Sequence, residues 1–73
     1  MVKIEKEVNG VATQLVAKYM GKKMYDWKVT SFVTPMLPIS YMGRTKGLSG
    51  AICLALNRAS EGIRESVSAI AYE

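Results

Sequence analysis

The densest group of residues able to do chemistry lies at positions 43–50, which read Gly-Arg-Thr-Lys-Gly-Leu-Ser-Gly. Glycines let a backbone approach a phosphate closely, and a helix N-terminus adds unpaired N–H groups and the positive end of its dipole. The order of glycine, lysine and hydroxyl differs from that of a Walker A loop. We therefore predict an anion-binding loop at a helix start, with an ordinary solvated basic loop as the alternative. Its residues are Arg44, Thr45, Lys46, Gly47 and Ser49.

A second candidate site interleaves cations with aromatic rings. Rings on a sheet can stack on nucleic-acid bases while lysines hold the phosphates. The alternative is that the rings pack against a helix as part of the core. The residues of this secondary patch are Lys22, Lys23, Tyr25, Trp27 and Lys28.

Groups suited to catalysis or metal binding are scarce. The chain has no histidine, one cysteine and six acidic residues, none of which form a paired arrangement in the sequence. These counts exclude a serine-histidine triad, the usual general base at neutral pH and a tetrahedral zinc site. We predict a protein that is not an enzyme and that uses no cofactor or metal.

The distribution of charge favours an anionic partner. Residues 1–46 hold eight of the ten Lys and Arg against three of the six Asp and Glu, whereas residues 47–73 hold two against three. A basic segment of this kind fits nucleic acid or a nucleotide. The alternative is a phage-type inhibitor or regulator that binds a protein through an apolar surface, to which the five methionines would contribute.

The segment before residue 34 predicts antiparallel strands. Residues 2–19 fit both a strand and a helix period, but Asn9-Gly10 at their centre is the strongest short hairpin signal and is costly inside a helix. Residues 24–33 are rich in aromatic and β-branched side chains and predict a third strand. Pro35 and Pro38 then predict a loop over residues 34–47. A helix over residues 3–20, giving an all-α fold, is the alternative.

The remainder of the chain predicts one long amphipathic helix from Ser49, as its N-cap, to Tyr72. Apolar residues recur on one face at spacings of three or four. They are Ile52, Leu56, Ala59, Ile63, Val67 and Ile70. The predicted fold is therefore α+β, a three-stranded antiparallel sheet followed by a C-terminal helix.

The 73 residues predict one small domain over residues 1–73, with a core of modest stability. Cys53 has no second cysteine to pair with, so no disulfide supports that core and a cytoplasmic location is expected. No apolar run is long enough to span a membrane. We expect a homo-oligomer, most simply a dimer, with Leu54 at its interface because that side chain lies off the apolar stripe.

Overall fold

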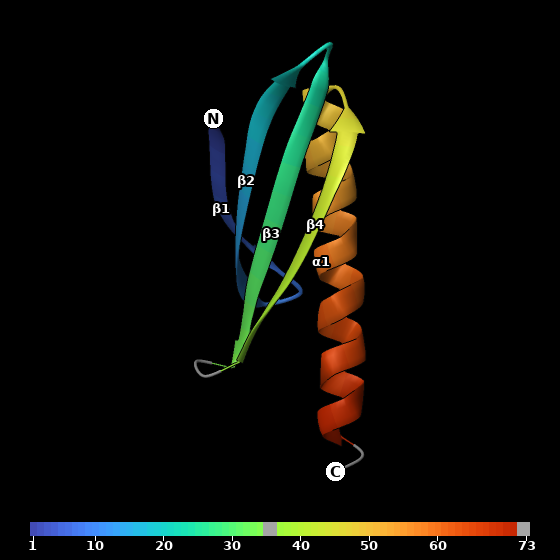
Figure 1. Ribbon diagram of the computed structural model, residues 1–73. Coiled ribbons are helices and arrows are strands. Elements are labelled where there is room, and N and C mark those ends of the chain that lie inside the picture. Colours follow the sequence, from blue (N-terminus) through green and yellow to red (C-terminus); the bar gives the residue numbers. More distant parts are fainter. Residues whose placement is uncertain (35–36, 72–73) are drawn as a thin grey trace.

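A four-stranded antiparallel sheet in the order β1-β2-β3-β4 is covered on one face by a single helix (Figure 1). The computed structural model describes residues 1–34 and 37–71. The elements are β1 (Val2–Val8), β2 (Val11–Gly21), β3 (Met24–Thr34), β4 (Leu37–Lys46) and α1 (Leu48–Ala71). The α+β class and the hairpin at Asn9-Gly10 are confirmed, and the all-α alternative is wrong.

The predicted three-stranded sheet is one strand short, because the expected loop over residues 34–47 is largely β4. This strand pairs with β3 from Met24↔Lys46 to Thr34↔Leu37. Pro38 is compatible with β4 because β4 is an edge strand, where a missing N–H need not cost a ladder hydrogen bond. The prolines and glycines of this segment therefore predict a loop, whereas the segment forms a strand whose alternate residues line the core.

The two hairpin turns within residues 1–34 both use left-handed backbone. Asn9 and Gly10 have φ of 51° and 78°, as a type I′ turn requires, and both residue types suit it. Lys22 and Lys23 have φ of 52° and 62° in the turn between β2 and β3, although lysine has no preference for this conformation. The second turn therefore carries backbone strain that the first one avoids.

Replacing this strained pair, Lys22→Asn with Lys23→Gly, should stabilise the protein by about 1 kcal/mol, because the new residues accept positive φ more readily. Urea denaturation measures the change in the free energy of unfolding. The control introduces the same two residues within β3, as Lys28→Asn with Val29→Gly. It should destabilise the protein. A lower stability for the turn variant would show that the lysine side chains contribute contacts that outweigh the strain.

The helix packs on the sheet through small side chains. Ala51, Ala55 and Ala59 are fully buried and Ile63 is 2% exposed. Ile52 and Leu56 from the predicted stripe are only half-buried, and Val67 is 52% exposed. Ala59 and Ile63 of the predicted stripe are thus buried as expected. The rest of the buried face is rotated towards Ala51 and Ala55, because the sheet supplies the large side chains and the helix must approach closely. The side chain of Ile70 and all of Tyr72 lie outside the described residues.

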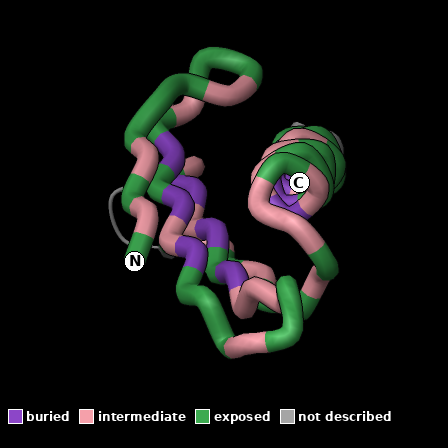
Figure 2. Tube along the Cα trace, turned by 90° about the horizontal axis from the view of Figure 1, so that it is seen from above, coloured by how far each residue is buried: buried purple, intermediate pink, exposed green. Residues whose placement is uncertain are grey.

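The large side chains of the sheet come from the face that looks towards α1. Leu15, Trp27 and Val29 are buried there and Tyr41 packs against them. Viewed along the helix, the buried residues gather where sheet and helix face each other, and the opposite face of the sheet is open (Figure 2). Each strand therefore carries one set of residues into the core and the alternate set onto this open face.

Candidate functional site

The predicted anion-binding loop does not form as one site. Arg44 and Thr45 are neighbours in β4 and therefore point to opposite faces of the sheet. Thr45 Oγ1 accepts a hydrogen bond from the Trp27 indole N–H at 3.0 Å on the helix side. The Gly47 N–H donates to the Lys23 carbonyl at 2.7 Å, so that amide is already used. A cradle that converges on one phosphate is absent from these residues.

The start of the helix also differs from the prediction. The helix begins at Leu48, and the Gly47 carbonyl accepts the Ala51 N–H at 3.1 Å. Gly47 is therefore the N-cap, with φ of 84°, and Ser49 is an exposed residue of the first turn. Ser49 thus lies beyond the position from which a capping hydroxyl acts.

Arg44 is engaged with a carboxylate on the open face. Its Nε donates to Asp26 Oδ1 at 2.6 Å and its Nη2 donates to Asp26 Oδ2 at 3.3 Å, so the ion pair is bidentate. The Arg44 hydrogen bonds hold the pKa of Asp26 below its usual range, and the nearby Lys18 charge acts in the same direction. The same pair raises the pKa of Arg44. Asp26 is therefore ionised at neutral pH and neutralises part of the local positive charge.

The secondary patch divides between the two faces in the same way. Trp27 is 8% exposed and Tyr25 is packed against the core, so these rings lie on the helix side. Tyr25 also stacks at a tilt on Tyr19, with ring centroids 5.2 Å apart. Lys28 is exposed on the open face, and Lys22 and Lys23 are exposed in the turn. Base stacking on Trp27 would require the helix to leave, so the alternative interpretation of these rings as core is favoured.

The strand register gathers a different set of cations on the open face. Lys18 and Arg44 flank Asp26 in one row across the sheet, and Lys28 lies in the next row. Lys46 ends the same face of β4. We call Lys18, Lys28, Arg44 and Lys46 the basic face; all four are exposed and they come from three strands. Among the described residues, no carboxylate lies within ion-pair distance of Lys18 or Lys28.

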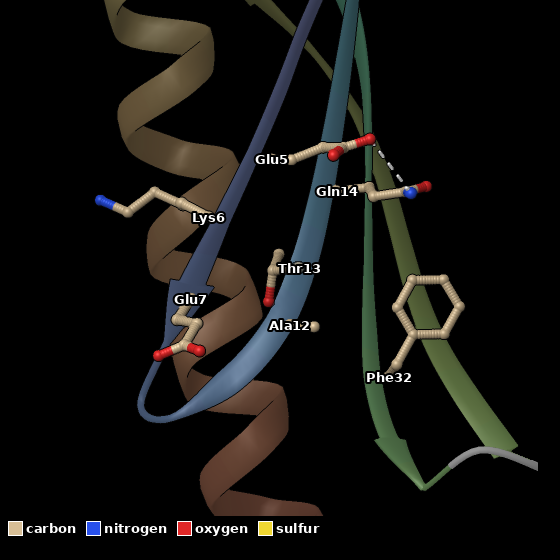
Figure 3. Close-up of a pocket in the computed structure, with 7 residues that line it drawn as sticks. All are labelled: Glu5, Lys6, Glu7, Ala12, Thr13, Gln14 and Phe32. Carbon is tan, nitrogen blue, oxygen red and sulfur yellow. Dashed lines mark hydrogen bonds between the residues drawn. The ribbon is translucent and has the colours of Figure 1, made fainter.

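The opposite end of the open face has the other sign. A shallow hollow there is lined by Glu5, Lys6, Glu7, Ala12, Thr13, Gln14 and Phe32 (Figure 3). Glu5, Gln14 and Phe32 project to the same side of the sheet, whereas Lys6 projects to the other side. The Gln14 amide donates a long hydrogen bond of 3.5 Å to Glu5. The open face therefore runs from a basic end beside the Lys22-Lys23 turn to an acidic end beside the Asn9-Gly10 turn.

The sequence alone does not reveal the basic face, because its residues are far apart in the chain and the sequence predicts a loop where β4 forms. With residues 37–46 read as a strand, period two alone places Arg44 and Lys46 together and Thr45 opposite them. Within residues 1–34 and 37–71, no cluster of three metal-ligating side chains is found. The described helix lacks the apolar length that a bilayer crossing requires.

No family model, curated protein or solved structure matches this chain.

Proposed function

We propose that the protein is a non-enzymatic binding protein that holds the phosphate backbone of a nucleic acid on its basic face. The observation that carries this proposal is the convergence of four exposed cations, from three strands, around the single carboxylate of Asp26. Arg44 is paired with Asp26, whereas Lys18, Lys28 and Lys46 have no ion-pair partner among the described residues. Each of these three lysines can neutralise a phosphate and release a counterion, which is the main source of affinity in sequence-independent binding.

The geometry favours an extended polyanion over a mononucleotide. The cations occupy successive rows of the sheet, which repeat about every 7 Å along a strand, and neighbouring strands lie about 5 Å apart. Small ligands are usually enclosed in concave pockets, whereas the hollows beside Arg44 on the basic face are shallow and open. Lys22 and Lys23 are exposed in the turn that precedes β3 and extend the positive surface beyond that end of the sheet. A strand of phosphates can follow such a surface from the turn across the basic face.

The proposal predicts a large effect from Lys18→Ala combined with Lys28→Ala. These cations have no ion-pair partner among the described residues, so their charge is available to phosphates. We expect the affinity for a labelled single-stranded oligonucleotide to fall about tenfold or more, and the slope of log affinity against log salt to decrease by about two. Fluorescence anisotropy across a range of salt concentrations measures both quantities.

The matched control removes two exposed cations elsewhere, Lys6→Ala with Arg64→Ala. Lys6 projects away from the open face and Arg64 lies on the exposed side of α1, so net charge falls equally without touching the basic face. Equal losses in both double variants would contradict a located site and indicate attraction by net charge. If the wild-type protein binds neither single strands nor duplex at low salt, the proposal fails.

If the wild-type protein binds no nucleic acid, the alternative function, a regulator that binds a protein partner, becomes the preferred one. The open face also carries apolar side chains, of which Met42 is 76% exposed beside Lys28. Methionine adapts its shape to varied protein surfaces. A stoichiometric protein retained by the wild type and lost in Met42→Glu would support this second function.

A further inference from the structure

The outer edge of β1 is one of the two edges of the sheet. In the described part of the chain, β1 ends the sheet and no strand pairs with its outer side. The other edge strand, β4, carries Pro38, a residue that blocks strand addition. β1 contains no proline over its seven residues, Val2–Val8. β1 therefore lacks the proline of β4, and its charged side chains restrict pairing to a strand that matches them with opposite charges.

The core is also incomplete beside this edge. The helix lies mainly against β3 and β4 and least against β1, which stands at the far side of the sheet (Figure 1). Val2 and Ile4 pack against the buried cluster but remain half exposed, even though Leu15, which pairs with Ile4, is 1% exposed. An additional strand beside β1 would cover these two side chains.

The hairpin fixes which backbone groups of β1 are available. Residues that flank a two-residue hairpin turn form a hydrogen-bonded pair, here Val8 with Val11. Since the pattern alternates, Val8, Lys6, Ile4 and Val2 direct their N–H and C=O groups to β2. The groups of Lys3, Glu5 and Glu7 face outwards, and any added strand must pair with these residues.

We propose that a second copy of this chain occupies this edge, with the two β1 strands antiparallel about a two-fold axis at Ile4. In this register Lys3 lies opposite the partner's Glu5, and Glu5 lies opposite the partner's Lys3, so both cross-strand pairs join opposite charges. Ile4 meets the partner's Ile4 and continues the core. The next register, centred on Glu5, joins Lys3 with the partner's Glu7, but it sets Glu5 against the partner's Glu5 and places Ile4 opposite the partner's Lys6, so it loses the apolar contact between the two Ile4 side chains.

The dimer is therefore an eight-stranded sheet with both helices on the same face, since the two-fold axis is perpendicular to the sheet. The interface is self-complementary because the sequence Val-Lys-Ile-Glu-Lys-Glu-Val places a cation and an anion at equal distances on the two sides of Ile4. Lys3 and Glu5 are exposed on the open face, so their substitution leaves the core of each subunit intact.

Charge exchange at Lys3 and Glu5 tests this arrangement in solution by sedimentation velocity over a range of concentrations. Lys3→Glu alone sets like charges together twice, as does Glu5→Lys alone, and each should raise the dimer dissociation constant about tenfold or more. The double variant, Lys3→Glu with Glu5→Lys, restores both opposite pairs and should dimerise as the wild type does. A mixture of the two single variants should form heterodimers, because both cross-strand pairs then join opposite charges.

The controls separate this interface from others. Circular dichroism melting should show that every variant is folded, and Leu54→Glu on the exposed side of α1 should leave the dimer unchanged. A wild-type protein that stays monomeric at millimolar concentration would overturn the proposal. Dimers that resist the single changes but dissociate with Leu54→Glu would overturn it as well, in favour of a helix-mediated interface. Binding to oligonucleotides is scored separately, so failure of one proposal is distinct from failure of the other.

Discussion

Gly43→Ala is expected to destabilise the protein by about 3 kcal/mol, although alanine normally improves on glycine inside a strand. Gly43 lies opposite Trp27 in the register of β3 and β4, on the helix side. A methyl group at Gly43 would stand 2.7 Å from Cε2 of the indole and closer still to Cζ2. The ring has little room to move, because Trp27 is 8% exposed and its N–H is held by Thr45. Urea denaturation of the purified variant measures the loss.

Gly50→Ala is the matched control for this prediction. Gly50 lies in the first turn of α1, and the nearest atom to an added Cβ is Thr45 Cγ2 at an ordinary 3.5 Å. Helix propensity should therefore dominate, and the variant should gain up to about 1 kcal/mol. Gly62→Ala should not show this gain, because the new methyl group would collide with the Tyr41 ring. A variant at Gly43 as stable as the wild type would mean that the indole does not rest on this glycine.

Ile63→Ala is the second change with a large expected effect. Ile63 is 2% exposed, and removing a buried isoleucine typically costs about 2–5 kcal/mol. A domain of this size commonly has only about 3–5 kcal/mol of stability, so the variant should be largely unfolded or aggregated. Near-ultraviolet circular dichroism of Trp27 reports the loss of packing.

Two neighbours on α1 provide the comparison for Ile63. Arg64 is exposed, so Arg64→Ala should change the free energy of unfolding by less than about 0.5 kcal/mol. Val67 belongs to the apolar stripe predicted from spacing but is 52% exposed, so Val67→Ala should cost less than about 1 kcal/mol. Losses of similar size at Ile63 and Val67 would restore the predicted helix face and contradict the observed one.

Local signals in the sequence were sufficient for much of the fold. Asn9-Gly10 defines the first turn through backbone conformation alone, and alternation defines the strands around it. The apolar period predicts the helix and two of its buried residues, Ala59 and Ile63, but not the turn of the buried face towards Ala51 and Ala55. Period identifies large apolar residues, whereas the surface in closest contact with the sheet consists of Ala51, Ala55 and Ala59. Small residues contribute little to an apolar periodicity. The large side chains of the sheet nevertheless require small residues on the helix face that contacts them.

The candidate site was harder to predict because it depends on strand pairing. Lys18, Lys28 and Arg44 come together only through the register of β2, β3 and β4, which the sequence does not state directly. Because the sequence predicts a loop over residues 34–47, the predicted sheet lacks two of the four cations, Arg44 and Lys46. The predicted loop also places Thr45 beside Arg44 on one surface, whereas the pleat separates them.

The order of the elements has a consequence for the speed of folding. Each strand after β1 pairs with the strand that precedes it in the chain, and α1 follows directly on β4. Such a meander needs no long-range crossover. Little loop-closure entropy is therefore lost before stabilising contacts form. Folding on a time scale of milliseconds is expected for mixed domains with this proportion of local contacts. A rapid passage to the native state limits the time during which unpaired strands of different molecules can meet and aggregate.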